Sequence, residues 1–462
     1  MGSIASDNPV HIGSDRQLLL DSRLIDELRD ARQVLHQPER REAAVRIDHP
    51  WEEGGLAYAV LFEDGGRFRA WYRCIPHADN NRTDRACTAY AESSDGISWR
   101  KPELGLIDFR GSTANNLVID DPDLVNFSPF LDEEAPAEER YKGIGRRGAI
   151  YTATSPDGLR WRKNPEPVQT EGPFDSHNIA FRDPWTGQYV MYTRGIRRDG
   201  ELGHGATRAF KEGVRWIRRA TSDDFVHWSP LEAIDTGDAP LEHMYTNSCV
   251  PYERSPGLYL MFPSRFVNSR SPTPDWPYPG VNDGVLMSSH DGLHFDRLFP
   301  EAFVRPGPDP GNWHDRSVYI MRGLLRTGPT ELSLYMTENW RMPTSCIRRL
   351  TTRLDGFASV QAPYRGGQFT TKPLIFSGDQ LRLNMSTSAA GSIRVEVQDE
   401  NGKPFPGLSL ADSPELFQDQ TDLAVQWESG AEVGPLAGQP VRLRFVMYDA
   451  DLYALRFCRK EE

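Results

Sequence analysis

The sequence predicts an all-β protein, a five-bladed β-propeller followed by a C-terminal β-sandwich. A short motif recurs at even spacing, and Val, Ile, Tyr, Phe and Trp alternate with polar residues between its copies. The 35 prolines and 39 glycines among 462 residues favour short strands and many turns. We therefore expect an N-terminal extension at 1–41, a propeller at 42–365 and a sandwich at 366–462.

The repeated motif is a turn around one aspartate, usually followed by glycine and then an aromatic residue. Its copies read "ESSDGISW", "TSPDGLRW", "TSDDFVHW", "SSHDGLHF" and the decayed "TRLDGFAS", with turn aspartates Asp95, Asp157, Asp224, Asp291 and Asp355. Successive aspartates are 62, 67, 67 and 64 residues apart. Asp-Gly suits a hairpin turn because both residues tolerate positive φ. Four antiparallel strands per repeat make one propeller blade.

Position within the repeat separates structural acids from candidate catalytic ones. The first strand of each blade lines the central channel and begins at the ligand face. The turn after that strand lies at the far face, and "FRDPWTGQY" places Asp183 in such a turn. We therefore expect Asp183 and the repeated turn aspartates to be structural.

The ligand face should collect the residues at the start of each first strand. Carboxylates, amides, histidines and aromatic rings suit a sugar site, and glycoside cleavage needs two carboxylates across the bond. Crowding carboxylates in one channel raises the pKa of at least one of them, which suits an acid. The candidates are Asp48, Trp51, Glu52, Glu53, Asp123, Asn126, Asp175, His177, Asn178, Glu242, His243, Tyr245, Asn247, Trp313, His314, Asp315 and Arg316.

Arginine recurs at the end of the second strand of four blades. The segments "RFRAWYR", "RYKGIGR", "QYVMYTR" and "YLMFPSR" end at Arg73, Arg146, Arg194 and Arg265. These guanidinium groups would stand behind the channel residues, where they would either orient carboxylates or meet an anionic substrate.

The C-terminal tail alternates as a β-sandwich does. "SIRVEVQDENGKPFPG" and "VRLRFVMYDADLYALRF" each place apolar residues at every second position, as in Ile393, Val395 and Val397.

With this tail, the chain resembles the five-bladed propeller glycosidases, closest to glycoside hydrolase family 32, with relatives in families 43, 62, 68 and 117. That resemblance implies a nucleophile from the first blade at Glu52 (or Asp48 or Glu53), a transition-state stabiliser at Asp175 and an acid/base at Glu242. The family's Asn-Asp-Pro-Asn-Gly signature is absent, Arg-Asp-Pro closes its strand instead of opening it, and Glu242 precedes His243 where the family has cysteine. The sugar is therefore left open.

We interpret the chain as a cytoplasmic glycosidase that cleaves a small oligosaccharide, such as a fructoside or another furanoside. Substrate contacts are assigned to Asp48, Trp51, Asn126, His177, Asn178, His243, Tyr245, Asn247, His314, Asp315, Arg316, Arg73, Arg194 and Arg265. No cofactor is expected. Metal binding through His177, His243 and His314 is an alternative that is not adopted. Retention and inversion differ in carboxylate separation, about 5.5 Å or less against about 6.5–9.5 Å.

Two other functions stay open. A glycoside phosphorylase would use Arg73, Arg194 and Arg265 to hold phosphate, and a non-catalytic propeller would bind sugar without turnover. The net charge of −13 argues against nucleic acid as a partner. No signal-peptide pattern or membrane-length apolar run is present, and five scattered cysteines fit a reducing cytoplasm. A homo-oligomer is left open.

Overall fold

The computed structural model describes residues 8–76, 86–198, 201–203, 213–272 and 276–460. This part of the chain is built from β-strands, with four short 3-10 helices, so the all-β prediction is confirmed. The 3-10 helices are η2 (Pro122–Leu124), η3 (Ala137–Glu139), η5 (Pro310–Asn312) and η6 (Gly434–Leu436). No helix in these ranges is long and apolar enough to span a bilayer.

The chain divides into two compact units. Unit 1 comprises residues 1–37, 253–256 and 353–462, and unit 2 comprises 38–252 and 257–352. Residues 10–35, which the sequence assigns to an N-terminal extension, form strands of unit 1.

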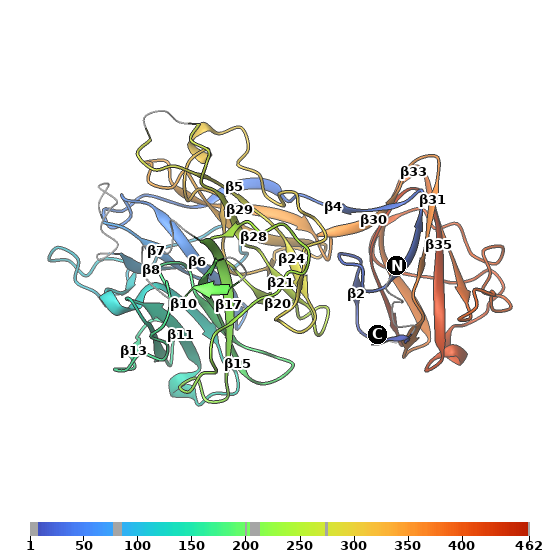
Figure 1. Ribbon diagram of the computed structural model, residues 1–462, viewed down its shortest axis with the longest axis horizontal. Coiled ribbons are helices and arrows are strands. Elements are labelled where there is room, and N and C mark those ends of the chain that lie inside the picture. Colours follow the sequence, from blue (N-terminus) through green and yellow to red (C-terminus); the bar gives the residue numbers. More distant parts are fainter. Residues whose placement is uncertain (1–7, 77–85, 199–200, 204–212, 273–275, 461–462) are drawn as a thin grey trace. The chain divides into compact units, whose positions relative to one another are not determined.

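Unit 2 consists of antiparallel sheets in which the strands mostly follow chain order (Figure 1). The first sheet contains β6 (Leu56–Asp64), β7 (Arg67–Cys74), β8 (Cys87–Ser93) and β9 (Leu117–Ile119). The second contains β10 (Val125–Leu131), β11 (Tyr141–Arg146), β12 (Ile150–Ser155) and β13 (Arg162–Lys163). The third contains β14 (Ile179–Arg182), β15 (Tyr189–Arg198), β17 (Val214–Ser222) and β18 (Glu232–Ala233), with β16 (Glu201–Gly203) beside β15.

The remaining sheets of unit 2 keep this pattern with shorter strands. One contains β20 (Val250–Pro251), β21 (Tyr259–Met261), β24 (Met287–Ser289) and β25 (Phe295–Asp296). Beside it, β19 (His243–Met244), β22 (Ser264–Val267) and β23 (Val281–Gly284) pair with one another. The last contains β26 (Tyr319–Ile320), β28 (Glu331–Glu338), β29 (Cys346–Arg353) and β5 (Glu39–Arg46), with β27 (Leu325–Arg326) beside β28.

The last sheet takes its outermost strand from the beginning of unit 2. Strand β5 pairs antiparallel with β29, so residues about 300 positions apart complete one sheet. Arg46 lies opposite Cys346, and Glu39 lies opposite Thr351.

The first strands of the sheets, or the residues next to them, contact one another. Strand β10 packs on both β6 and β14. The Ser176 hydroxyl, just before β14, donates to the Tyr245 carbonyl at 2.6 Å. The Ser248 hydroxyl, just before β20, donates to the Ile320 carbonyl on β26 at 2.7 Å. The Leu61 amide on β6 donates to the Arg322 carbonyl just after β26 at 2.9 Å. These contacts form a closed circuit.

Four copies of the repeated motif form the same hydrogen-bonded turn. In the second copy, Asp157 Oδ1 accepts from the amides of Leu159 and Arg160, both at 2.8 Å. The Ser155 hydroxyl donates to this carboxylate at 3.0 Å and accepts from the Gly158 amide at 2.9 Å. The equivalent aspartates Asp95, Asp224 and Asp291 bind the same backbone positions. The fifth, Asp355, instead belongs to unit 1 and pairs with Arg254 at 2.8 and 2.9 Å.

Asp183 is a buried corner residue, as the sequence predicts. It lies between β14 and β15 and accepts from the Trp185 amide at 3.0 Å and the Thr186 hydroxyl at 2.8 Å. The Tyr259 hydroxyl of the following sheet also donates to it, at 2.5 Å. The Asp183 carboxylate therefore links the turn between β14 and β15 to the following sheet.

Unit 1 is one continuous ten-stranded sheet. Its strands β33 (Gln380–Gln398) and β35 (Pro440–Cys458) are each 19 residues long and run side by side (Figure 1). The other strands are β1 (Val10–Gly13), β2 (Gln17–Leu18), β3 (Ile25–Arg29), β4 (Arg32–Leu35), β30 (Ala358–Ala362), β31 (Gly367–Thr371), β32 (Leu374–Phe376) and β34 (Asp419–Ala424). Alternate residues of the long strands, such as Val395 and Leu443, form its apolar core. Because hydrogen bonding links all ten strands, the two-sheet sandwich stays a prediction.

Candidate active site: a tyrosine–arginine cluster

Three tyrosine rings stack where the first strands of unit 2 begin. Tyr319 lies between Tyr58 and Tyr245, with ring centroids at 5.6 and 5.3 Å. His177 stacks on the other face of this group, 5.3 Å from Tyr58. All four residues are buried. We call the three tyrosines, together with Arg73, Arg146, Arg194, Arg215 and Arg316, the tyrosine–arginine cluster.

Unusual backbone conformations accompany these positions. Tyr58 has φ 51° and lies where the pairing of β6 with β7 shifts register, between Ala57 and Val60. Arg316 has φ 65°. Left-handed backbone at residues other than glycine costs about 1–3 kcal/mol and gathers at functional sites. A register shift of this kind also changes the direction of a side chain, here that of Tyr58.

Arginines surround the tyrosine stack. The guanidinium carbon of Arg194 lies 4.9 Å from the Tyr245 ring centre, and that of Arg215 lies 5.4 Å from it. The Arg73 guanidinium lies 5.6 Å from the Tyr58 ring and 5.7 Å from the Trp340 ring. The charge of Arg146 acts on Tyr58 and Tyr245. The recurring arginine thus reaches the cluster from three successive sheets.

The arginines change the acidity of one tyrosine. Burial opposes ionisation of Tyr245, but Arg316, Arg194 and Arg215 outweigh it and lower its pKa to about 7. Burial raises the pKa of Tyr58 to about 12, with the Tyr245 charge adding to the effect. Among the three stacked rings, Tyr245 is therefore the one whose phenolate is stabilised.

Two carboxylates border the cluster from different sheets. Asp175 pairs with Arg194, and half of its side-chain surface is exposed. Asp315 is buried and lies 3.2 Å from Arg316 and 3.6 Å from Arg341. The Trp276 indole N–H donates to Asp315 at 2.7 Å. Both aspartates are among the residues singled out from the sequence.

Several predicted substrate contacts are buried framework residues around the cluster. Asn126 donates to the Ser176 carbonyl at 3.0 Å, and Asn178 accepts from the Arg194 amide at 3.1 Å. Asn247 donates to the His177 carbonyl at 3.4 Å. Asn126 and Asn247 thus link segments of neighbouring sheets, and Asn178 links the first and second strands of its own sheet.

The predicted first-blade acid lies inside its own sheet. Glu52 is fully buried, and it accepts from the Tyr72 hydroxyl at 2.7 Å and from Lys101 at 2.8 Å. Burial raises its pKa against the opposing effect of Lys101. Asp48 pairs with the same lysine, and the Trp51 indole donates to Asn116 at 2.9 Å. These contacts tie the three residues to the first sheet.

The predicted acid/base also has close cationic partners. Glu242 lies 2.5 Å from Arg297 and 3.4 Å from Arg265. Arg265 also pairs with Asp283, at 2.6 and 2.9 Å. His243 accepts from the Arg215 amide at 3.0 Å. Within the described residues, no hydrogen bond or ion pair joins Glu52, Asp175 and Glu242 to one another.

His314 is buried beside the candidate Asp315. Its ring packs on Trp276, with centroids 4.2 Å apart. Its Nδ1 lies 2.9 Å from the Asp315 carbonyl oxygen. In the described ranges, no group of three or more His, Cys, Asp or Glu residues gathers as a metal site would require.

Sequence reasoning missed Tyr58, Tyr319, Arg215 and Arg341. The even spacing could have indicated Tyr319, because it starts a first strand. Tyr58 lies inside its strand and faces the cluster only because of its left-handed backbone. No local pattern marks that conformation.

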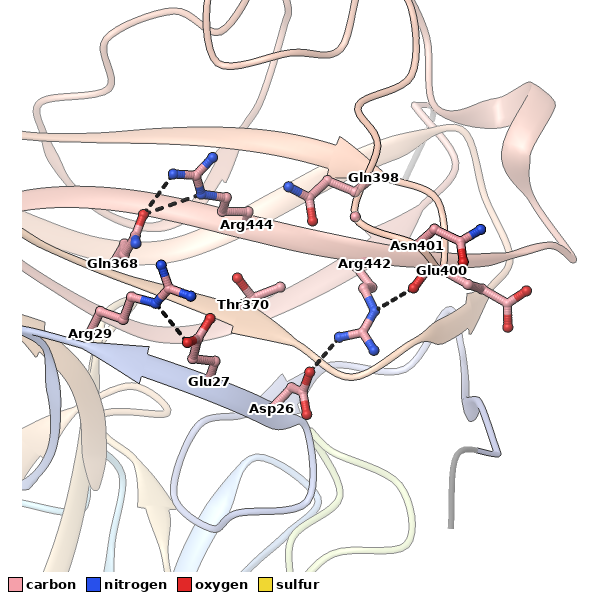
Figure 2. Close-up of a pocket in the computed structure, with 11 residues that line it drawn as sticks. Asp26, Glu27, Arg29, Gln368, Thr370, Gln398, Glu400, Asn401, Arg442 and Arg444 are labelled. Carbon is pink, nitrogen blue, oxygen red and sulfur yellow. Dashed lines mark hydrogen bonds and ion pairs between the residues drawn. The ribbon is translucent and has the colours of Figure 1, made fainter. Parts of the chain in front are cut away.

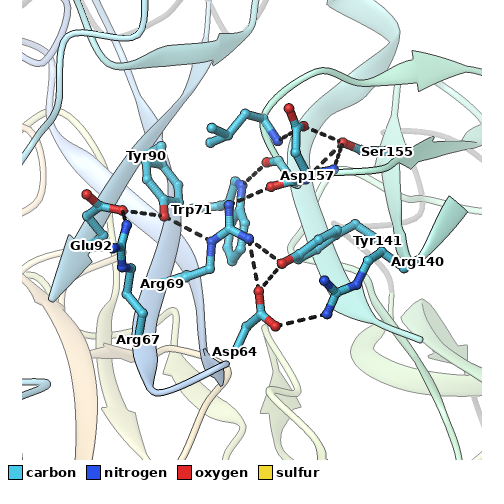
Figure 3. Close-up of polar contacts among 12 residues, drawn as sticks. Asp64, Arg67, Arg69, Trp71, Tyr90, Glu92, Arg140, Tyr141, Ser155 and Asp157 are labelled. Atoms are coloured by element: carbon cyan, nitrogen blue, oxygen red, sulfur yellow. Dashed lines mark hydrogen bonds and ion pairs between the residues drawn. The ribbon is translucent and has the colours of Figure 1, made fainter. Parts of the chain in front are cut away.

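The opposite end of strand β7 has a fully paired arginine (Figure 3). Arg69 donates to the Tyr90 hydroxyl at 2.9 Å, to the Asp157 carbonyl at 2.6 Å and to the Tyr141 hydroxyl. It also lies 3.3 Å from Asp64. This network joins the first sheet to the second at the turn that contains Asp157.

A polar hollow of about 480 Å³ lies within unit 1 (Figure 2). Its arginines are paired with neighbours. Arg442 contacts Asp26 at 2.5 Å, Arg444 donates to Gln368 at 2.8 Å, and Arg29 contacts Glu27 at 2.6 Å. A ligand in this hollow would compete with existing partners.

No family model matches the sequence. A stretch of 119 residues, 23% of the chain, is 29% identical to "Uncharacterized protein Rv1502" of Mycobacterium tuberculosis strain H37Rv, and 30% identical to "Uncharacterized protein MT1551" of strain CDC 1551. The match spans about a third of each relative, 34% of its length.

Solved structures share the architecture loosely. A structure titled "Glycoside hydrolase" is 12% identical, with a TM-score of 0.48 over 69% of this chain and 92% of its own. The catalytic domain of a Coprinopsis cinerea GH62 α-L-arabinofuranosidase is 11% identical, with a TM-score of 0.45 over 70% and 98%. A Bacillus subtilis family 43 arabinoxylan arabinofuranohydrolase is 13% identical, with a TM-score of 0.40 over 89% and 97%. At these scores the likenesses define neither a substrate nor a reaction.

Proposed function

We propose that the chain is a cytoplasmic glycoside hydrolase that cleaves a small oligosaccharide at the tyrosine–arginine cluster, on a five-bladed propeller of the family 32 type. One observation carries the proposal. The circuit of first strands brings aromatic rings, guanidinium groups and two aspartates from separate sheets to one place. Aromatic faces with a few polar groups suit a sugar ring.

Asp175 and Asp315 are the carboxylates that we assign to the reaction. Each lies beside an arginine of the cluster, and a glycosidase needs two carboxylates that flank the bond to be cleaved. Glu52 and Glu242 are instead assigned to positioning, because their partners Lys101, Tyr72, Arg265 and Arg297 lie outside the cluster. The family resemblance instead implies Glu52, Asp175 and Glu242. Substitutions of the four carboxylates decide between the two assignments.

The test is turnover of chromogenic glycosides and natural oligosaccharides by the full chain. We expect Asp175→Asn and Asp315→Asn each to lower kcat about 100-fold or more, the usual loss for an acid or base. Glu52→Gln and Glu242→Gln should have smaller effects while unfolding remains cooperative. Loss of turnover in Glu242→Gln, with Asp315→Asn still active, would restore the family-based assignment.

Phosphorolysis is a second candidate, favoured by one observation. No carboxylate is among the groups that most influence the charge of Arg73 or Arg146, so phosphate would meet unneutralised guanidinium groups. Turnover that requires inorganic phosphate would establish this reaction. Saturable sugar binding without turnover, with or without phosphate, would point to a non-catalytic sugar-binding protein.

A further inference from the structure

The tyrosine–arginine cluster carries more positive than negative charge. Its five arginines are accompanied by two aspartates, and each aspartate is already paired: Asp175 with Arg194, and Asp315 with Arg316 and Arg341. Removing charges from water costs several kcal/mol per ion unless a partner compensates. The imbalance indicates a place for an anion.

Arg73 and Arg146 show where the compensation is missing. Arg73 is 6% exposed, and its Nε has no hydrogen-bond partner among the described residues. Burial lowers its pKa to about 10, which means that its surroundings disfavour the positive charge. The Arg146 Nε likewise lacks a partner in the described part of the chain. Both side chains therefore hold a buried Nε–H that no described residue accepts.

A neighbouring imidazole offers a further polar atom. His177 is 2% exposed and stacks on Tyr58, and its Nε2 has no partner within the described ranges. Burial, with the Arg322 charge, lowers its pKa to about 3, so the ring is neutral. A neutral imidazole can accept from a sugar hydroxyl beside the anionic group.

We propose that the tyrosine–arginine cluster binds an oxyanion, a carboxylate or phosphate, between Arg73, Arg146 and Arg316, with the stacked tyrosines against a sugar ring. A planar guanidinium pairs with both groups through two parallel hydrogen bonds. The inference deepens the proposed function, on which it rests, because it gives the substrate class as anionic. The two sources of the oxyanion are an acidic sugar and inorganic phosphate.

With its pKa lowered to about 7, Tyr245 is partly ionised near neutral pH and offsets part of the positive charge of the cluster when no ligand is bound. The ionisation of Tyr245 is influenced by Arg194 from β15, Arg215 from β17 and Arg316 beside β26. The buried phenols of Tyr58 and Tyr319 are its other ionisable neighbours. Arg73 and Arg146, from β7 and β11, also act on it. An anion among these arginines would cancel their effect and raise the pKa of Tyr245. Anion binding near pH 7 would therefore take up a proton.

The experiment is isothermal titration calorimetry of the full chain with glucuronate, inorganic phosphate and glucose. We expect glucuronate or phosphate to bind saturably and glucose at least tenfold more weakly. Tighter binding of glucuronate would identify the substrate as an acidic sugar. Tighter binding of phosphate would identify the site as one for phosphorolysis. The heat of anion binding should vary with the ionisation enthalpy of the buffer, because binding takes up a proton. In Tyr245→Phe this dependence on the buffer should be lost.

Matched variants on strand β7 provide the control. Arg73→Gln should weaken anion binding tenfold or more. Arg67→Gln removes an equal charge from an exposed side chain, which pairs with the buried Glu92, and should leave anion binding unchanged. If Arg73→Gln does not fold, Arg73→Lys and Arg146→Gln serve in its place. Absence of binding by both anions, or equal binding by the Arg73 and Arg67 variants, would overturn the proposal. Cleavage of a neutral glycoside would still support the proposed function.

Discussion

Two arginines of strand β7, four residues apart, have opposite surroundings. Arg69 binds Tyr90, Tyr141 and the Asp157 carbonyl at one end of the strand (Figure 3), and these partners keep its pKa above the ordinary value despite burial. Arg73 lies against the rings of Tyr58 and Trp340, and burial lowers its pKa. The paired end stabilises the fold, and the uncompensated end is suited to a ligand.

The largest effect should come from removing the paired arginine. Arg69→Met leaves two buried hydroxyl groups and the Asp157 carbonyl without their donor. Asp64 keeps only Arg140 as a cationic partner, and loss of one partner from a buried ion pair costs about 3–5 kcal/mol. Urea unfolding of the full chain measures the change. A loss below about 1 kcal/mol would mean that the two ends of β7 do not differ as described.

Tyr245→Phe should change how stability depends on pH. The pKa of Tyr245 is lowered to about 7 in the folded chain, against about 10 when unfolded. Its ionisation therefore adds stability as the pH rises from about 7 to 10, and this stability is lost as the pH falls through 7. The difference between wild type and Tyr245→Phe should grow by up to about 1.4 kcal/mol per pH unit in that range. If the free energies of unfolding of wild type and Tyr245→Phe depend on pH in the same way, Tyr245 is not ionised in the folded chain.

A turn aspartate should matter less than the arginine it supports. Asp157→Ala removes an acceptor from the amides of Leu159 and Arg160, and a lost cap of this kind costs about 0.5–2 kcal/mol. Asp157→Asn keeps an oxygen and should lose less. Chemical denaturation compares the two variants, and equal losses would show that the oxygen does not act as an acceptor.

The smallest effect on stability should come from the uncompensated arginine. Arg73→Met removes a buried charge that lacks a hydrogen-bond partner at Nε, so we expect no loss of stability, or a gain of about 1 kcal/mol. Urea unfolding in phosphate-free buffer measures this, with Arg67→Gln as the surface control. A loss comparable with that of Arg69→Met would make Arg73 structural.

The sequence predicted the features that repeat locally. The turn aspartates bind their own backbone within three residues, so the motif alone locates them, as it does the corner at Asp183. Arg73, Arg146 and Arg194 were found because each follows an aromatic residue of its second strand by five positions. The predicted strand end was wrong for Arg194, because β15 continues to Arg198. The same regularity led to the all-β class.

The direction of individual side chains was not predictable. The sequence assigned Glu52, Asp175 and Glu242 to one site, yet only Asp175 contacts an arginine of the cluster, Arg194. Glu52 contacts Lys101, and Glu242 contacts Arg297. Tyr58 depends on its own left-handed backbone within a strand, and Asp315 contacts Arg341 from a distant segment as well as the adjacent Arg316. Such contacts arise from tertiary packing, which overrides local pattern.

Strand β5 has a consequence for how the chain reaches its native state. It is the first strand of unit 2 to be synthesised, but it pairs with β29, which ends at Arg353. Its hydrogen-bonding edge therefore stays unpaired until almost all of unit 2 has left the ribosome. Contacts between such distant segments form slowly, since a long loop must close first. A nascent chain that stops before Cys346 would therefore expose an unpaired strand and become a target for chaperones or self-association.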